Sequence, residues 1–177
     1  MPSHLDLSAP IRVTDPAILR AIQVLRQRAW AADGEVPEFI AGQDIFTDPH
    51  DLSAIHFAMM ADGKPVAAAR LNISDDIFGA PDADAYEGYE DRIPGPVASL
   101  TRLVVDPACR GLGAARRMDE IRMEAILATP AKSVVGVAEL PYRIRALERM
   151  GFRLLGPTRR RYLQSAPSQV LVKLIEG

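Results

Sequence analysis

The segment from Pro96 to Arg117, read PVASLTRLVVDPACRGLGAARR, constrains the fold of this chain more than any other stretch. Its first half is an apolar, β-branched run of strand length. The run ends at Asp106-Pro107, because proline has no backbone donor with which to extend a strand pairing. Arg110-Gly111-Leu112-Gly113 follows, and residues 114–127 then have a composition that favours a helix. The segment therefore predicts a strand, a glycine-rich turn and a helix, in that order.

The glycine-rich turn is suited to binding an anion. Glycine lets the backbone approach a ligand closely, and the first N–H groups of a helix have no partner within it. Together with the helix dipole and a guanidinium at Arg110 or Arg116, these donors suit a pyrophosphate. Neither the Walker pattern nor the Rossmann pattern fits, since the first lacks Gly-Lys-Ser/Thr and the second has Arg116 where it needs glycine or alanine. An ordinary turn between a strand and a helix is the alternative.

Length and composition restrict the class of protein. With 177 residues, the chain is expected to form one domain, residues 1–177, and the formal net charge of −2 argues against a dedicated nucleic-acid binder. Cys109 is the only cysteine, so no intramolecular disulfide can form, and a reducing, cytoplasmic location is expected. The N-terminal stretch MPSHLDLSAP has neither a basic start nor an apolar h-region, and no run has the length of a membrane span, so no membrane partner is expected.

The residues before the glycine turn predict a strand, a helix, a loop and a hairpin. Asp15 is the expected N-cap of the helix, and Asp62-Gly63 is typical of a hairpin turn. In chain order these elements are expected at residues 11–14, 15–32, 33–53 and 54–71. Residues 72–96 are rich in aspartate and glutamate and are expected to form an exposed acidic insertion. These acids could attract a cationic amine substrate. The alternative is a metal site, although the segment has no histidine or cysteine and no calcium-loop spacing.

The residues after the motif helix complete an α/β chain. Residues 133–140 predict a strand buried on both faces, and the helix before it makes a parallel crossover the economical connection. Pro141 suits the first turn of another helix that ends before Gly151. Closing strands are expected at residues 153–155, 162–164 and 169–175, the last two as a pair.

The glycine turn carries a family resemblance. Arg110 to Ala115 fit the pattern Arg-x-x-Gly-x-Ala, and Gly151-Phe152 follows later, as in the GNAT superfamily of N-acetyltransferases, which this chain resembles. The resemblance implies an α/β fold with a mixed, mostly antiparallel sheet that has a central parallel strand pair and is flanked by helices. It implies acetyl-CoA as co-substrate and no metal. The residues that it assigns to acetyl-CoA are Leu103, Val104, Val105, Arg110, Gly111, Leu112, Gly113, Ala114, Ala115 and Arg116.

The implied reaction is attack of an amine on a thioester, which needs a base for the amine proton and an acid for the departing thiolate. Glu139, at the end of the parallel strand, is the candidate base, with a salt-bridged strand end as the alternative. Tyr142 is the candidate acid, because Leu147 stands where the family usually has its tyrosine. A nucleophilic Cys109 is disfavoured, since no histidine accompanies it.

The front half of the chain is also similar to the acyl-homoserine-lactone synthases, which share this fold. Arg26 with Trp30 resembles their arginine and aromatic helix pattern, and Asp44 with Phe46 resembles their acidic and aromatic motif. Thr47 and Ser99 stand where that family has acids. The resemblance implies an acceptor pocket lined by Arg26, Trp30, Asp44, Arg70 and Arg102. An ion pair between Arg102 and a loop acid such as Asp44 is the alternative.

These patterns together predict an N-acyltransferase that moves acetyl from acetyl-CoA to an amine of a small molecule or amino-acid-like acceptor. Two alternatives stay open. The first is an acyltransferase of autoinducer-synthase type with a longer acyl donor. The second is a non-catalytic acyl-CoA-binding module, which the leucine at position 147 suits. The expected partner is the small-molecule amine, without nucleic acid, and a homodimer is compatible with the sequence.

Overall fold

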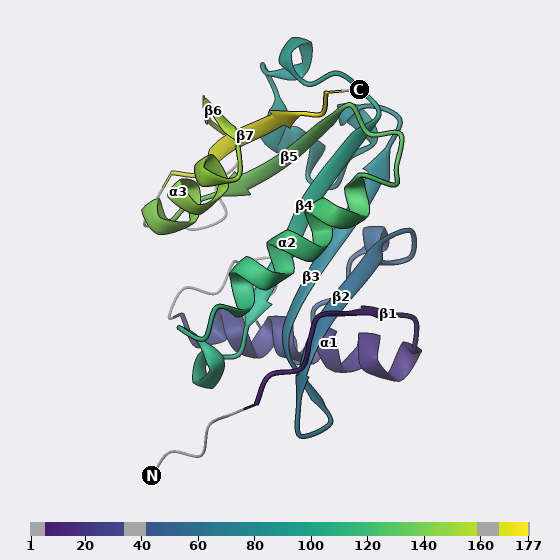
Figure 1. The fold of residues 1–177 in the computed structure, drawn as a ribbon, viewed down its shortest axis with the longest axis vertical. Helices are drawn as coiled ribbons and strands as arrows, with labels where there is room; N and C mark the ends of the chain where they lie inside the picture. Colours follow the sequence, from purple (N-terminus) through teal and green to yellow (C-terminus); the bar gives the residue numbers. More distant parts are fainter. Residues whose placement is uncertain (1–5, 34–41, 159–166, 177) are drawn as a thin grey trace. The chain divides into compact units, whose positions relative to one another are not determined.

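The computed structural model describes residues 6–33, 42–158 and 167–176 (Figure 1). Its helices are α1 (Pro16–Ala31), α2 (Ala114–Ile126) and α3 (Pro141–Arg149). Its strands are β1 (Ile11–Val13), β2 (Ile55–Ala61), β3 (Lys64–Ser74), β4 (Val97–Val105), β5 (Ser133–Ala138), β6 (Arg153–Pro157) and β7 (Gln169–Leu174). They form one sheet in the order β1-β2-β3-β4-β5-β7-β6, in which β4 and β5 are the parallel pair and the other neighbours are antiparallel. This confirms the expected fold class.

The chain divides into two compact units. Unit 1 comprises Met1–Arg70 and Arg102–Met123, and unit 2 comprises Leu71–Thr101 and Glu124–Gly177. The strands β3 and β4 and the helix α2 contribute residues to both units. The single domain expected for residues 1–177 stays a prediction.

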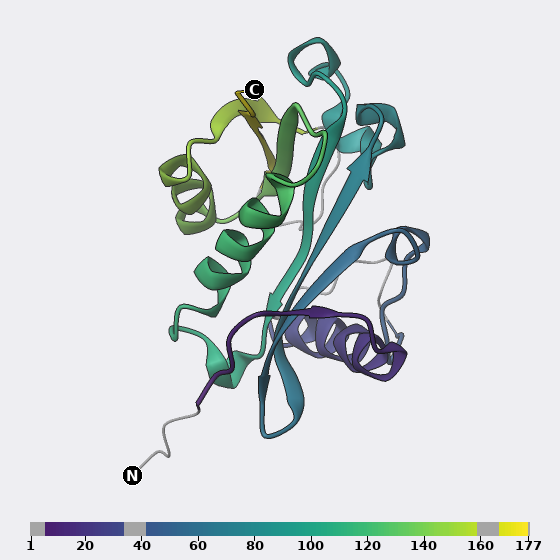
Figure 2. The same cartoon turned by 45° about the vertical axis from the view of Figure 1, so that its right-hand side comes forward.

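The core of unit 1 forms where α1 packs on the sheet. Ile22, Leu25 and Ala29 of α1 are buried in one cluster with Ala58 of β2, Ala68 of β3 and Val104 of β4. The helix begins as expected, because the carboxylate of Asp15 accepts a hydrogen bond from the backbone N–H of Ala17 at 2.8 Å. Figures 1 and 2 both show α1 alongside β1 and β2. Because of this packing, the face of α1 that carries Gln23 and Arg26 points toward the interior, and both side chains are buried.

Unit 2 corrects the expectation for residues 72–96. The acids Asp75, Asp76, Asp84, Glu87 and Asp91 are exposed as expected. However, β3 continues to Ser74, and three 3-10 turns follow it, at Ile77–Gly79, Ala83–Tyr86 and Glu90–Arg92. The apolar residues between the acids are buried in a core cluster that also contains residues of β4, β5 and β7. The segment is therefore part of the core, since its buried side chains are Ile77, Ala80, Ala85, Tyr86 and Ile93.

The C-terminal strands pair differently from the expectation. β7 pairs antiparallel with β5 on one side and with β6 on the other. The partner of the last strand is therefore Arg153–Pro157, whereas the expected partner, residues 162–164, lies outside the described residues. Gly151 lies just after the end of α3 and has a backbone φ of +88°, a conformation that glycine adopts at little cost. α3 contacts β5, β6 and β7.

Candidate functional site

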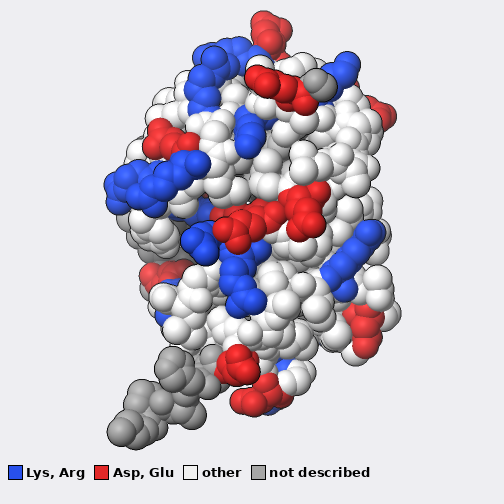
Figure 3. All heavy atoms as spheres, viewed as in Figure 1, with Lys and Arg blue, Asp and Glu red and all other residues white. Residues whose placement is uncertain are grey.

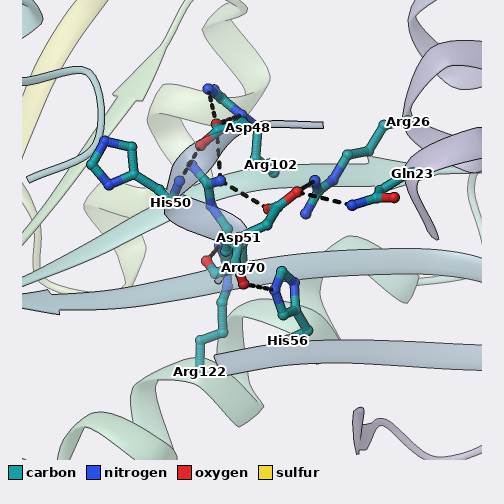
Figure 4. Close-up of polar contacts among 9 residues, drawn as sticks. All are labelled: Gln23, Arg26, Asp48, His50, Asp51, His56, Arg70, Arg102 and Arg122. Atoms are coloured by element: carbon teal, nitrogen blue, oxygen red, sulfur yellow. Dashed lines mark hydrogen bonds and ion pairs between the residues drawn. The ribbon is translucent and has the colours of Figure 1, made fainter. Parts of the chain in front are cut away.

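Three arginines and two aspartates meet in unit 1 and form what we call the arginine cluster (Figure 4). Arg26 comes from α1, Arg70 from β3 and Arg102 from β4. Both acids come from one short turn, in which Asp48 is the N-cap of the 3-10 helix Pro49–Asp51 and Asp51 is its last residue. Four segments that are distant in sequence thus supply the cluster.

Asp51 lies at the centre of the arginine cluster. Arg26 donates from Nη1 to both carboxylate oxygens of Asp51, at 3.0 and 2.8 Å. Arg70 donates from Nη1 to Oδ1 at 2.9 Å, and Gln23 donates from Nε2 to Oδ2 at 3.3 Å. The backbone carbonyl of Asp51 contacts Nε2 of His56 at 2.9 Å. Asp51 therefore joins α1 and β3 through its buried carboxylate and β2 through its backbone carbonyl.

Asp48 binds the guanidinium groups of Arg70 and Arg102. Its Oδ2 lies 2.9 Å from Nη1 of Arg70 and 2.7 Å from Nη2 of Arg102. Its Oδ1 accepts a hydrogen bond from the backbone N–H of His50 at 2.8 Å. The side chains are largely buried, with 8% of Asp48 and 10% of Arg102 exposed. Arg70 therefore bridges the two aspartates, with Asp48 at the edge of the cluster nearest to solvent.

The surroundings shift the pKa values of the cluster. Burial would raise the pKa of Asp48, but the charges of Arg102 and Arg70, with hydrogen bonds from Arg102 and the backbone of His50, outweigh it and lower the pKa to about 2. Burial likewise opposes ionisation of Asp51, but hydrogen bonds and charges from Arg26 and Arg70 lower its pKa. Burial lowers the pKa of His56, so its ring is neutral near pH 7. Both carboxylates therefore carry fixed negative charge.

The backbone of Arg102 has an unusual conformation. Its φ is +53°, in the left-handed region that non-glycine residues seldom adopt, although it lies within β4. The side chain is held by Asp48 and lies over the ring of Phe46, 5.2 Å from the ring centroid. Phe46 also contacts Trp30 edge to face, with 5.1 Å between ring centroids. Trp30 therefore lies within one aromatic contact of Arg102.

The arginine cluster contains three of the five residues expected to line an acceptor pocket, and the pocket itself stays a prediction. The alternative, an ion pair between Arg102 and a loop acid, is present, with Asp48 as the acid. The structure brings Arg26, Arg70 and Arg102 together, as the lactone-synthase likeness implied. Asp44 is exposed, and none of the ion pairs described for the cluster includes it. The two acids have the spacing sought at Asp44 and Thr47, but they lie four positions later, at Asp48 and Asp51. The N-cap signal of Asp48 before Pro49 could have found them.

The glycine turn of unit 1 is open to solvent. Gly111 and Gly113 have φ values of +81° and +79°, and a Cβ atom added to either would meet no atom within 4 Å. Glycine is needed there for its backbone conformation rather than for lack of space. α2 begins directly after the turn at Ala114, which is buried, while Gly111, Leu112 and Gly113 are exposed. The first backbone N–H groups of α2 are thus preceded by an accessible turn.

The arginines near the glycine turn have intramolecular partners. Arg110 donates from Nη1 to Asp33 at 2.6 Å and from Nη2 to the carbonyl of Ala29 at 3.3 Å, so its side chain is held at the end of α1. Arg116 is exposed and forms an ion pair with Glu120 one helical turn later, at 3.3 Å. Exposed pairs of this kind add little stability and are readily exchanged for another anion.

The strand residues that the resemblance assigns to acetyl-CoA lie at the end of β4. Val104 is buried in the core of unit 1, while Leu103, Val105 and Ala115 are partly buried. Within unit 2, the parallel register of β4 with β5 runs from Val97 and Ser133 to Leu100 and Gly136. Beyond Gly136, the β5 residues Val137 and Ala138 pair with β7.

Glu139 follows β5 in unit 2 and is partly buried. Burial raises its pKa, although a hydrogen bond from the hydroxyl of Ser168, at 3.1 Å from Oε1, partly opposes the rise. No ion pair of Glu139 is present among the described residues, so the salt-bridged alternative finds no support there. A carboxylate whose pKa is raised toward neutral pH is suited to accepting a proton.

The other candidates for proton or acyl transfer are less well placed. Tyr142 lies in the first turn of α3 with 65% of its surface exposed. Leu147, at the usual position of the family's tyrosine, is buried, and its Cδ1 approaches the backbone of Gly136. Cys109 is buried, and burial raises the pKa of its thiol, which opposes a nucleophilic role.

The described residues contain no group of three or more histidine, cysteine, aspartate or glutamate side chains placed to hold a metal ion. Among them, no helix combines the length and the apolar character needed to cross a bilayer. On the face drawn in Figure 3, basic and acidic side chains are interspersed.

Comparisons with known proteins agree with the fold. The model of the acetyltransferase (GNAT) family matches residues 19–152. No curated protein matches the sequence significantly. An N-acyl amino acid synthase from uncultured soil microbes is similar in structure, with a TM-score of 0.67, 13% identity and coverage of 96% of this chain and 91% of that one. The polyamine N-acetyltransferase of Drosophila melanogaster has a TM-score of 0.67, 18% identity and coverage of 96% and 100%. The ribosomal-protein-S18-alanine N-acetyltransferase of Escherichia coli has a TM-score of 0.62, 14% identity and coverage of 97% and 96%.

Proposed function

Because the chain belongs to the acetyltransferase (GNAT) family, we propose that it transfers an acetyl group from acetyl-CoA to an amine of a small acceptor. The observation that carries the proposal is the open turn at Gly111 and Gly113, directly before α2. Backbone N–H groups at a helix start bind phosphate groups well, and an accessible glycine turn lets the pyrophosphate of coenzyme A reach them. The donor-binding residues are those expected from the sequence, from Leu103 to Val105 and from Arg110 to Arg116.

Arg116 is the better placed of the two arginines to reach a donor phosphate. Its side chain is exposed, and its ion pair with Glu120 can be exchanged at small cost. Arg110 has two partners at the end of α1, so its contribution to the turn is to hold that turn against α1. The proposal therefore assigns phosphate binding to Arg116 and a positioning role to Arg110.

Glu139 is the proposed base. The nitrogen of the amine forms a bond to the acetyl carbonyl carbon, the carbon–sulfur bond breaks, and the amine proton passes to the Glu139 carboxylate directly or through water. The departing thiolate takes a proton to give free coenzyme A. The support for Glu139 is its burial, the raised pKa and a single hydroxyl donor that orients its carboxylate. Tyr142 is the proposed thiolate acid, since it is the phenol nearest in sequence to Glu139.

The acceptor is proposed to be a small amine rather than a large macromolecule. Among the similar structures, the Drosophila melanogaster enzyme is named for a polyamine acceptor, whereas the Escherichia coli enzyme is named for a ribosomal protein. One neighbour is an N-acyl amino acid synthase, which supports an amino-acid-like acceptor and keeps a longer acyl donor as the alternative within enzymes. Acetyl-CoA and a long-chain acyl-CoA, offered at equal concentration with one amine, separate these two donors.

One observation favours a second candidate function. Leu147 is buried where the family usually has its tyrosine, so the common thiolate acid is missing. A catalytically silent protein that binds acyl-CoA would have this feature. Acyl-CoA would stabilise such a protein by roughly 2.7 kcal/mol at a hundredfold excess over Kd and so raise its melting temperature. The protein would not consume the acyl-CoA.

Release of free thiol from acetyl-CoA, measured with a panel of amines, tests the proposed function. We expect release that depends on both protein and amine and that Glu139→Gln lowers by about 10²-fold or more. Glu148→Gln, which alters an exposed acid on α3, is the matched control and should leave the rate unchanged. A raised melting temperature with acetyl-CoA, but no thiol release with any amine, would favour the binding module.

A further inference from the structure

We propose that the end of α1 is a positioning element of the donor site, which holds the glycine turn through two ion pairs of opposite direction. In one pair, Arg28 of α1 binds Asp106, and in the other, Arg110 binds Asp33, which lies two residues after α1. We call these four residues the reciprocal clamp. The inference rests on the proposed function and adds Arg28, Asp33 and Asp106 as residues that shape the turn without touching the donor.

The first observation is the arrangement of the two pairs. Each of the two segments supplies one guanidinium and one carboxylate, so they bind each other twice. Asp106 comes directly after β4, and Arg110 lies four residues later, next to Gly111. All four residues of the clamp belong to unit 1, and Figures 1 and 2 both show the end of α1 beside the segment that precedes α2. A segment that is bound at two points cannot rotate freely about either one.

The second observation is that Asp106 shapes the chain locally while it binds Arg28. Its Oδ1 accepts a hydrogen bond from the backbone N–H of Ala108 at 3.0 Å, and its Oδ2 accepts one from Arg28. The first bond makes Asp106 the N-cap of the 3-10 turn Pro107–Cys109, which leads into the glycine turn. The backbone N–H of Asp106 also donates to the carbonyl of Val66 at 2.8 Å. One carboxylate thus sets the local conformation and attaches it to α1.

The third observation is that Arg110 is held at the C-terminal end of α1. Its Nη1 donates to Asp33 at 2.6 Å, and its Nη2 donates to the carbonyl of Ala29 at 3.3 Å. The last carbonyls of a helix carry partial negative charge and have no partner within the helix, so a guanidinium is favourable there. Movement of Arg110 toward a donor phosphate would break both contacts and remove a cation from the helix end. Arg110 is therefore better suited to holding the turn.

The exposure of the clamp suits positioning better than stabilisation of the whole fold. Arg28, Asp33 and Arg110 keep 59%, 48% and 45% of their side chains exposed, so each pair contributes little to the free energy of unfolding. However, Gly111 and Gly113 are exposed, and glycine permits many backbone conformations. A small energy is then enough to change the fraction of molecules in which the turn has its binding conformation. The clamp therefore acts on donor affinity by pre-organising the turn.

The two acids of the clamp give the sharpest test, because positioning and simple charge attraction predict opposite results. Asp106→Asn and Asp33→Asn each remove a negative charge near a site for an anion, so attraction alone would tighten acetyl-CoA binding. Asparagine at position 106 still accepts the bond from Ala108, so only the ion pair is lost. We expect each change to raise Kd by about fivefold in calorimetry. Unchanged or tighter binding in either variant would overturn the inference.

The matching change in α1 separates the ion pair from a general effect of charge. Arg28→Gln should raise Kd as Asp106→Asn does, whereas Arg28→Lys still pairs with Asp106 and should bind acetyl-CoA as the unaltered protein does. The double variant Arg28→Gln/Asp106→Asn should bind no more weakly than either single variant, because all three lack the same pair. Arg20→Gln on the exposed face of α1 and Glu124→Gln in the last turn of α2 are the controls. Additive losses in the double variant would show that the two residues act separately and would overturn the clamp.

Hydrogen exchange without the donor tests the clamp independently of the proposed function. The backbone N–H groups of Ala108 and Cys109 donate within the 3-10 turn, to the side chain and the carbonyl of Asp106. Their exchange should be faster in Arg28→Gln than in the unaltered protein, with the melting temperature nearly unchanged. Acetyl-CoA should in turn slow exchange at residues 29–33 of the unaltered protein, because coupling between two sites is reciprocal. Equal exchange of the 3-10 turn in both proteins would overturn the clamp.

The proposed function and this inference fail in different ways. If the unaltered protein binds no acetyl-CoA, the proposed function fails, and hydrogen exchange alone decides whether the clamp shapes the turn. If acetyl-CoA binds and an amine is acetylated, but Kd is the same in the clamp variants, the proposed function stands and the inference is wrong.

Discussion

The two buried acidic centres of this protein hold their carboxylates in opposite electrostatic surroundings. In the arginine cluster, three guanidinium groups outweigh burial and lower the pKa of Asp48 and Asp51. In unit 2, Glu139 has one hydroxyl donor, Ser168, so burial dominates and raises its pKa. A carboxylate with fixed charge organises structure and binding, whereas one that titrates toward neutral pH can accept a proton. Unit 1 therefore holds carboxylates of fixed charge, whereas unit 2 holds the carboxylate that we propose as the base.

The largest expected effect concerns Asp51. Replacing Asp51 with Asn leaves Arg26 and Arg70 buried without their shared counter-charge, which we expect to cost about 3–5 kcal/mol of unfolding free energy. Chemical denaturation measures the change. Asp44→Asn, an exposed acid close in sequence, is the control and should change stability by less than about 0.5 kcal/mol. Equal effects of the two changes would show that the Asp51 carboxylate does not stabilise the arginine cluster.

A second effect should appear in acid. The pKa of Asp48 is lowered from 3.8 to about 2 on folding, so its contribution is complete above pH 3.8 and is lost as the pH falls toward 2. The shift corresponds to about 2 kcal/mol of stability. Stability measured across this range should fall more steeply in the unaltered protein than in Asp48→Asn. Parallel curves for the two proteins would contradict the fixed charge assigned to Asp48.

The glycine turn should respond through donor affinity. Gly113→Asp places an L side chain at a φ of +79° and adds a negative charge beside the proposed phosphate site. We expect acetyl-CoA binding to weaken by at least about tenfold in calorimetry, which corresponds to 1.4 kcal/mol. Gly63→Asp has a similar φ of +74° and equal space in the hairpin turn, so it controls for backbone strain. Unchanged affinity in folded Gly113→Asp would remove the turn from the donor site.

The smallest expected effect concerns the pKa of Glu139. The Ser168 hydroxyl donates to its carboxylate and so favours the charged form, and Ser168→Ala should raise the pKa of Glu139 further. Because the base acts when deprotonated, the acidic limb of the pH profile of kcat/KM should move to higher pH. Ser133→Ala removes a buried hydroxyl that donates to the carbonyl of Pro94, and it should leave the profile in place. If the acidic limb does not shift in Ser168→Ala, then either Ser168 does not influence the pKa of Glu139 or Glu139 is not the base.

Local sequence signals predicted much of the fold. The strand, glycine turn and helix from Val97 to Ile126 could be recognised because their determinants lie within a few residues of one another. The same holds for the N-cap of α1 at Asp15 and for the hairpin of β2 and β3. The apolar residues from Ile77 to Ile93 were overlooked, because their acidic neighbours dominate the composition of that segment.

The candidate site was predictable only in part. The three arginines could be named from a family resemblance, but their partners could not. The ion pairs join residues that are far apart in sequence, 25 positions for Arg26 with Asp51 and 54 for Arg102 with Asp48. Which of several loop acids meets them depends on the path of the chain, and no local periodicity records that path. The hydroxyl of Ser168 on Glu139, 29 positions away, could not be foreseen for the same reason.

The central claim is that the protein transfers an acetyl group to nitrogen, with Glu139 as the base. Mass spectrometry of the amine after incubation with acetyl-CoA tests it most directly, because it distinguishes transfer from hydrolysis and from binding. The account predicts an N-acetylated amine in equal amount to the free thiol, and a loss of both in Glu139→Gln. Free thiol without an acetylated amine, or the same product yield in Glu139→Gln, would contradict it.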